Sequence, residues 1–191
     1  MLPSISVVVP VFRSEDSLRE LHRRLVDILE PVDPAFEMIL VEDCGGDKSW
    51  NVIQELAEAD PRVRGMQLGR NYGQHNALLC GIRAARGRTI VTLDDDLQNP
   101  PEEIPRLLAK LVEGYDVVYG APEDETHGFL RNQASRITKL ARLLLHYSTE
   151  IQDREKVLIV GTTASDVAHS PAGTSAPPAS RSGHRSARSW S

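Results

Sequence analysis

The sequence predicts an α/β fold, with a mostly parallel sheet and helices on both of its faces. Two hydrophobic periods alternate along residues 1–120. Short runs rich in β-branched residues are typical of buried strands, and segments with apolar residues at helical spacing are typical of amphipathic helices. Because each strand-like run is followed by a helical segment and not by a hairpin turn, the pattern indicates consecutive βαβ units.

The elements can be placed along the chain in order. A helical segment begins near Leu18 after the first strand, and another begins after Asp47, which follows the second strand. Asp47 is expected to be the N-cap of that second helix. The second of these is expected to turn Trp50, Ile53 and Gln54 inward. The remaining helices are expected at 74–85 and 101–112, and the strands at 5–11, 38–41, 63–68, 88–93 and 116–120.

The overall composition excludes several classes of protein. The 191 residues are 40% hydrophobic and 26% charged, which fits one globular domain with a tail. A net charge of −5 argues against nucleic acid as a partner, since phosphate binding needs a basic surface. Cys44 and Cys80 form no metal-binding or disulfide pattern, so a reducing, cytoplasmic setting is expected. No apolar run reaches the roughly 20 residues of a membrane helix.

The chain changes character in its last third. Residues 126–149 carry basic side chains beside an apolar stripe, a pattern that fits either a helix at a membrane surface or a helix covering the sheet. Residues 151–161 could add one short strand. The rest is rich in Ala, Ser, Pro and Gly and is expected to be disordered. The predicted division is therefore a domain at 1–149 and a tail at 150–191.

Polar residues gather where the predicted strands end, at 10–13, 42–46, 69–73 and 94–98. Ligands of parallel α/β sheets bind at this carboxyl edge. Read as an extended segment, 94–98 would place Asp94, Asp96 and Gln98 on one face. Hard oxygen ligands in that arrangement suit Mg²⁺ or Mn²⁺, and the alternative is an acidic helix N-terminus.

The other strand ends leave their alternatives open. Glu42 and Asp43, followed by two glycines, could hydrogen-bond a nucleoside or form a polar turn. Arg70 and Asn71 follow the third strand, with His75 near the start of the next helix. No Gly-x-Gly-x-x-Gly follows a strand and no Gly-Lys-Ser/Thr loop occurs, which disfavours dinucleotide oxidoreductases and P-loop NTPases.

Six separated motifs occur in the order typical of one family: "VVVPVFRSEDSL", "LVEDCGGDKSW", "LGRNYGQHNALLCGIRAARG", "IVTLDDDLQNPPEEIPRLL", "EGYDVVYG" and "FLRNQASR". From about Ser4 to Leu145 the sequence resembles family-2 glycosyltransferases of the Rossmann-like GT-A nucleotide-diphospho-sugar transferase fold. It is most similar to polyprenyl-phosphate hexosyltransferases, the group of dolichol-phosphate mannose synthase and undecaprenyl-phosphate sugar transferases.

The resemblance implies a role for each matching position. Asp43 resembles the acid that binds uracil, and Asp95 stands where many relatives have a small residue. Asp96 and Arg131 are the residues expected to act in catalysis. The resemblance implies a metal site of Asp94, Asp96 and Gln98, and donor or acceptor contacts from Pro10, Val11, Glu15, Asp43, Arg70, Asn71, Asp94, Asp95, Ser135 and Arg136.

These roles imply a metal-dependent, inverting enzyme that moves a hexosyl group from a UDP- or GDP-sugar to a polyprenyl phosphate. It would use Mg²⁺ or Mn²⁺ and associate peripherally with the cytoplasmic face of a membrane. Relatives continue beyond Leu145 with acceptor-side elements where this chain has its tail, so the domain is expected to be C-terminally truncated. Two alternatives remain: a non-catalytic nucleotide-sugar-binding fragment, and a transferase with a soluble glycan acceptor.

Overall fold

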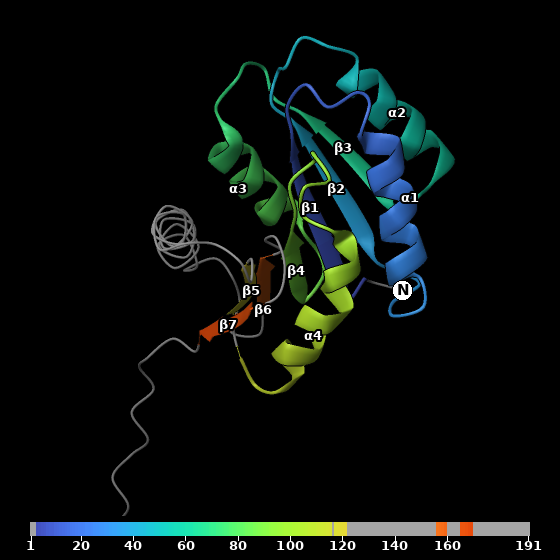
Figure 1. Cartoon of the computed structure of the whole chain (residues 1–191). Helices are drawn as coiled ribbons and strands as arrows, with labels where there is room; N and C mark the ends of the chain where they lie inside the picture. The colour runs from blue at the N-terminus through green and yellow to red at the C-terminus, as the bar shows by residue number, and fades with distance from the viewer. Residues whose placement is uncertain (1–2, 116, 122–155, 160–164, 170–191) are drawn as a thin grey trace, which may run out of the picture.

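The computed structural model of the chain describes residues 3–115, 117–121, 156–159 and 165–169 (Figure 1). Within these residues the strands form one sheet in the order β3-β2-β1-β4-β6-β5-β7. All neighbours are parallel except the pair β5 and β7. The strands are β1 (Ile5–Val11), β2 (Glu37–Glu42), β3 (Val63–Gln67), β4 (Thr89–Thr92), β5 (Val117–Ala121), β6 (Lys156–Ile159) and β7 (Ser165–His169).

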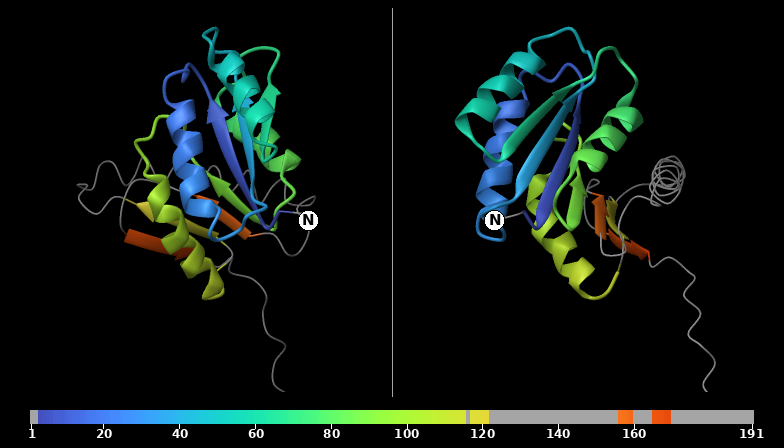
Figure 2. Two further views of the ribbon diagram at one scale, coloured as in Figure 1. Left: turned by 90° about the vertical axis from the view of Figure 1, so that its right-hand side faces the viewer. Right: turned by 180° about the vertical axis from the view of Figure 1, so that it is seen from behind.

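Helices cover both faces of this sheet, as the sequence predicts (Figure 2). Side chains alternate across β1: Val7 and Val9 pack toward α1, α2 and α4, whereas Val8 packs toward α3. Both faces of β1 are thus buried, which explains its unbroken apolar run. The helices are α1 (Leu18–Leu29), α2 (Ser49–Ala59), α3 (Gln74–Ala84) and α4 (Ile104–Val112).

Helix α3 lies close to the sheet because it presents a glycine there. A Cβ added to Gly81 would lie 2.4 Å from Val8 Cγ1 and 3.0 Å from Val41 Cγ2. Carbon atoms in van der Waals contact stay about 3.5–4.0 Å apart. The missing side chain therefore sets the distance between α3 and the two central strands.

The start of α2 differs from the prediction. Lys48 occupies the N-cap, and Asp47 precedes it, accepting hydrogen bonds from the backbone N–H (3.2 Å) and hydroxyl (2.7 Å) of Ser49. Gln54 is exposed and Val52 is buried beside Ile53. The buried stripe runs through positions three and four residues apart from Ser49, and Gln54 lies off that stripe.

The predicted helix at 101–112 begins as a 3₁₀ turn, η1 (Pro101–Glu103), and becomes α4 only at Ile104. Pro105 has no backbone N–H and cannot donate to the carbonyl of Pro101. Ile104 donates to that carbonyl instead, which gives the tighter turn.

Two strands come from the last part of the sequence. β6 confirms the short strand expected within 151–161, and it lies between β4 and β5. β7 pairs antiparallel with β5, so the expected disorder is wrong for Ser165–His169. Strand pairing uses main-chain groups, which the composition of a segment does not reveal. Residues 126–149 lie outside the described residues, and the division into 1–149 and 150–191 stays a prediction.

Candidate functional site

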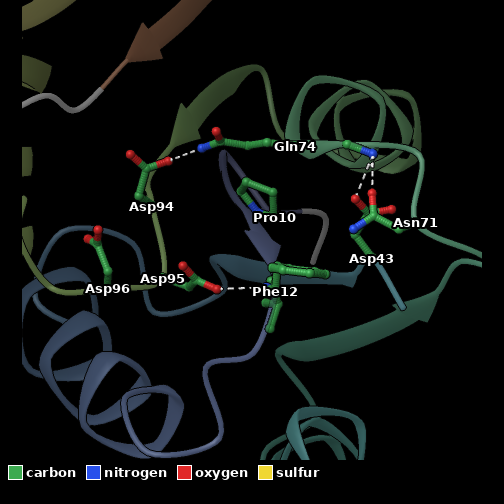
Figure 3. A pocket seen from close by; sticks show the side chains of 10 residues that line it. Pro10, Phe12, Asp43, Asn71, Gln74, Asp94, Asp95 and Asp96 are labelled. Atoms are coloured by element: carbon green, nitrogen blue, oxygen red, sulfur yellow. Dashed lines mark hydrogen bonds between the residues drawn. The ribbon is translucent and has the colours of Figure 1, made fainter. Parts of the chain in front are cut away.

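A cleft of about 370 Å³ opens at the carboxyl edge of the sheet (Figure 3). It lies where the loops after β1, β2, β3 and β4 meet, as expected for a parallel α/β sheet. Its lining residues are Pro10, Val11, Phe12, Asp43, Asn71, Gly73, Gln74, Asp94, Asp95 and Asp96. The predicted residues Pro10, Val11, Asp43, Asn71 and Asp94 to Asp96 are therefore brought together.

Asp43 lies at one end of the cleft, directly after β2, and is only 2% exposed. Its two carboxylate oxygens accept hydrogen bonds from the backbone N–H groups of Tyr72 and Gly73, each at 2.7 Å. Asn71 Oδ1 accepts a second bond from the Gly73 N–H at 3.0 Å. Gly73 has φ +88°, which favours glycine at this turn. Asp43 thereby fixes the loop after β3 beside its own strand.

The three aspartates after β4 point to different partners (Figure 3). Asp94 Oδ1 accepts a hydrogen bond from Gln74 Nε2 at 2.6 Å. Asp95 Oδ2 accepts from the Phe12 N–H at 2.9 Å and from the Ser14 hydroxyl. Asp96 is exposed. Asp95 is thus bonded to the loop after β1, whereas Asp94 is bonded to α3.

The extended conformation assumed for 94–98 is wrong. The chain turns from Asp95 onward, and Leu97 takes a left-handed conformation with φ +60°. Gln98 is exposed, its N–H donates to Asp96 Oδ1 at 3.0 Å, and it does not line the cleft. The period-2 rule holds only while the backbone stays extended, so it cannot place Gln98 with Asp94 and Asp96.

The electrostatic environment of Asp95 also distinguishes it. Burial raises the pKa of Asp95, although hydrogen bonds from Ser14 and Phe12 act in the opposite direction. The neighbouring charge of Asp96 raises it further. Burial and a like charge both disfavour the ionised form, which explains the direction of the net shift.

Three non-glycine residues at this edge have positive φ: Arg13 (58°), Cys44 (56°) and Leu97 (60°). Each lies in a different loop, after β1, β2 and β4. This conformation costs roughly 1–2 kcal/mol for an L-residue. The loops are also packed closely, because a Cβ added to Gly45 would lie 2.8 Å from Arg13 N. These three residues do not line the cleft, but each lies in a loop that supplies lining residues, and strained backbone is common near functional sites.

Other predicted residues lie near the cleft without lining it. Glu15 Oε2 accepts from the Lys48 N–H at 2.7 Å, and the Arg70 guanidinium lies 4.7 Å from the centre of the Tyr72 ring. Glu42 is buried, and its carboxylate accepts a hydrogen bond from the Gly45 N–H at 2.6 Å. This contact corresponds to the polar turn, one of the two alternatives that the sequence left open.

Three lining residues were given no role in the sequence analysis: Phe12, Gly73 and Gln74. Phe12 and Gly73 fall within the strand ends 10–13 and 69–73 that were expected at this edge, whereas Gln74 lies just outside them. Gln74 is the first residue of α3 and belongs to the motif that contains Arg70 and Asn71, so its position after a strand end was the available signal. Arg131, Ser135 and Arg136 lie outside the described residues, and their roles stay predictions.

The metal ion that the resemblance implies needs oxygen ligands in this cleft. Within the described residues no group of three or more His, Cys, Asp or Glu side chains stands close enough to hold a metal ion. Asp94 and Asp96 line the same cleft and supply two carboxylates. Mg²⁺ in phosphate-transferring sites is commonly held by one or two carboxylates with substrate phosphates and water completing its shell. The residues present fit that mode of binding.

The parallel sheet and the polar cleft at its carboxyl edge define an α/β domain suited to nucleotide-type ligands. The chain belongs to glycosyl transferase family 2, whose model matches residues 6–170. This confirms the resemblance found in the sequence.

Several curated proteins are similar to the chain. An undecaprenyl-phosphate 4-deoxy-4-formamido-L-arabinose transferase from Edwardsiella ictaluri is 42% identical over 134 residues, which cover 70% of this chain and 41% of that protein. A protein of the same name from Enterobacter sp. is 45% identical over 134 residues, with the same coverage of both chains. The chain therefore spans about two fifths of the length of these relatives.

Two solved structures support the fold. Staphylococcus aureus TarS 1–349 in complex with UDP matches 65% of this chain and 37% of that chain, with a TM-score of 0.53 and 24% identity. The mannosyltransferase PcManGT from Pyrobaculum calidifontis, in complex with GDP-Man and Mn²⁺, matches 65% and 36% with a TM-score of 0.54 and 18% identity. The predicted GT-A fold class is thus confirmed.

Within the described ranges, no helix combines the length and the apolarity needed to cross a bilayer.

Proposed function

We propose that this chain carries the donor-binding part of a glycosyltransferase that moves a glycosyl group from a nucleoside-diphosphate sugar to a polyprenyl phosphate. The observation that carries the proposal is that one cleft has Asp43 at one end and Asp94 and Asp96 at the other. The names of the similar proteins, which specify undecaprenyl-phosphate sugar transferases, support the acceptor class.

Asp43 is proposed to contact the nucleobase. Each carboxylate oxygen can accept two hydrogen bonds, and the backbone N–H groups of Tyr72 and Gly73 use one on each oxygen. The remaining capacity suits a ring N–H, which uracil and guanine both present. Pro10 and Val11 line the cleft beside Asp43, and Asn71 holds the facing loop.

The diphosphate is proposed to bind beside Asp94 and Asp96. Two carboxylates alone would repel a diphosphate, so this end of the cleft requires a cation. Bound Mg²⁺ or Mn²⁺ would neutralise the charge that develops on the departing diphosphate. Gln74 holds Asp94 through its side-chain amide, which orients one of the two carboxylates.

The proposed reaction is a single displacement at the anomeric carbon. An oxygen of the acceptor phosphate forms the new bond to that carbon. The bond from the carbon to the diphosphate oxygen breaks, and the nucleoside diphosphate leaves with the electron pair. A phosphate monoester is largely anionic at pH 7, so it needs orientation more than a general base. Arg131, Ser135 and Arg136 are proposed to pair with it, and one displacement inverts the anomeric centre.

The transferred sugar is proposed more broadly than the sequence predicts. The resemblance implies a hexosyl group, whereas the names of the similar proteins specify an arabinose derivative, which is a pentose. The donor therefore includes UDP- or GDP-linked hexoses and pentoses. Because a polyprenyl phosphate resides in a bilayer, the proposal includes peripheral association with the cytoplasmic face of a membrane.

A transfer assay tests this function. Purified full chain with Mn²⁺ is incubated with radiolabelled UDP- and GDP-sugars and a short polyprenyl phosphate, and the organic phase is counted. Label in the lipid fraction supports the proposal. Label on a soluble glycan without lipid would instead identify the soluble-acceptor alternative. Donor binding by calorimetry without any transfer would identify a nucleotide-sugar-binding fragment, and no nucleotide binding would overturn the donor site itself.

A further inference from the structure

Asp95 is the contact point between the loop after β4 and the loop after β1. Its carboxylate accepts hydrogen bonds from the Phe12 N–H and the Ser14 hydroxyl, and its carbonyl oxygen accepts from the Ser17 hydroxyl at 2.6 Å. These partners lie about 80 residues earlier in the chain. Three hydrogen bonds therefore join the turn that carries the aspartates to one short segment.

The same segment is also joined to the start of α2. The Ser14 N–H donates to Ser49 Oγ at 2.9 Å, and the Glu15 N–H donates to Asp47 Oδ2 at 3.2 Å. Residues 12–17 thus connect the loop after β2, next to Asp43, with the loop after β4. Because Asp95 itself belongs to the loop after β4, and the bonds to Ser49 and Asp47 do not involve it, a change at Asp95 is expected to affect the Asp94–Asp96 end of the cleft more than the Asp43 end.

We infer that Asp95 is a positioning residue, which holds the Asp94–Asp96 turn against residues 12–17 so that Asp94 and Asp96 meet the cation and diphosphate together. This inference rests on the proposed function. It differs from the direct ligand contact that the sequence predicts for Asp95.

The geometry favours positioning over direct binding. Asp95 Oδ2 already accepts two hydrogen bonds, and the side chain is directed toward Phe12, whereas Asp94 is directed toward Gln74 (Figure 3). Three adjacent carboxylates repel one another, and donors on the β1 side offset that repulsion for the middle one. Asp94 and Asp96 are then left to share one cation.

The test uses the full chain and measures the dissociation constants of UDP and GDP with Mn²⁺ and with EDTA by calorimetry. For each nucleotide, we define the metal gain as the dissociation constant in EDTA divided by the dissociation constant with Mn²⁺. For Asp95→Ala we expect the metal gain to fall about tenfold, while the affinity in EDTA changes less than twofold. Asp95→Asn keeps an oxygen acceptor for Phe12 and Ser14, and it should retain most of the metal gain. Asp16→Ala removes an exposed charge from the same segment and serves as the matched control.

Ser14→Ala provides an independent variant that leaves all three aspartates in place. A positioning role predicts a loss of about threefold in the metal gain, and less than twofold further loss when Ser14→Ala is added to Asp95→Ala. A direct ligand role predicts that Ser14→Ala changes nothing and that Asp95→Asn loses as much as Asp95→Ala; either result overturns the inference. An equal loss with Mn²⁺ and with EDTA also overturns it. A wild-type chain without any metal gain contradicts the proposed metal site itself.

Discussion

Replacing Asp43 by asparagine tests whether this carboxylate organises the cleft. Asp43 is buried and accepts one hydrogen bond on each oxygen, from the N–H groups of Tyr72 and Gly73. Asparagine has one oxygen and one NH₂ group, so it can accept from only one of them. The Gly73 N–H has a second acceptor in Asn71 Oδ1, whereas among the described residues the Tyr72 N–H donates to Asp43 alone. The amide oxygen is therefore expected to face Tyr72.

The cost follows from these contacts. Two hydrogen bonds to a charged acceptor contribute about 1.5–3 kcal/mol each, and one neutral bond of about 1 kcal/mol replaces them. Because Asn71 still accepts from Gly73, neither backbone N–H is left unpaired, and we expect Asp43→Asn to lower the free energy of unfolding by about 2–5 kcal/mol. Adding Asn71→Ala removes that second acceptor. The double variant should lose about 1–3 kcal/mol more than Asp43→Asn alone. Its total loss should exceed the sum of the losses of the two single variants.

Urea unfolding followed by circular dichroism measures these values, with calorimetric UDP binding as the functional readout. Asp16→Asn, at an exposed aspartate, is the matched control and should stay within about 0.5 kcal/mol of wild type. A loss below about 0.5 kcal/mol for Asp43→Asn would refute the reasoning. So would a double variant whose loss equals the sum of the two single losses, because the Gly73 N–H would then not be shared.

Three further outcomes are expected. Gly81→Ala should destabilise the fold by about 1 kcal/mol in urea, since overpacking against Val8 outweighs the gain in helix propensity; Gly69→Ala, with open space around it, should not. Burial raises the pKa of Asp60, but hydrogen bonds from Arg62 and His22 lower it more, to about 2. The lowered pKa stabilises the fold by up to about 2 kcal/mol above about pH 4, and this contribution is lost as the pH falls toward 2. Asp60→Asn should therefore make the free energy of unfolding depend less on pH between 4 and 2 or so, and an unchanged pH dependence would contradict this role of Asp60. Asp96→Ala should weaken UDP binding at least tenfold with Mn²⁺ and leave binding in EDTA unchanged, whereas wild-type affinity of the variant with Mn²⁺ would remove Asp96 from the metal site.

The central strands and helices could be read from the sequence because their periods are local. The predicted strand at 5–11 matches β1 fully, and the third helix differs from α3 by one residue. The capping of α2 and the 3₁₀ turn before α4 were missed, because one residue or one proline decides them. β7 was missed because this edge strand depends on main-chain pairing with β5, and the local sequence of Ser165–His169 does not indicate that pairing.

The sequence alone determined the class of the fold, the family and the edge of the sheet where the polar residues gather, since hydrophobic period and motif order are properties of the chain itself. The tertiary structure decided what each of those residues does. Only the folded chain brings Phe12 and Ser14 to Asp95, and Gln74 to Asp94, across separations of 20 to 83 residues. Gln98, which follows the left-handed turn at Leu97, is exposed and does not line the cleft. Such contacts depend on the relative placement of four loops, and loop placement follows from the packing of the whole sheet.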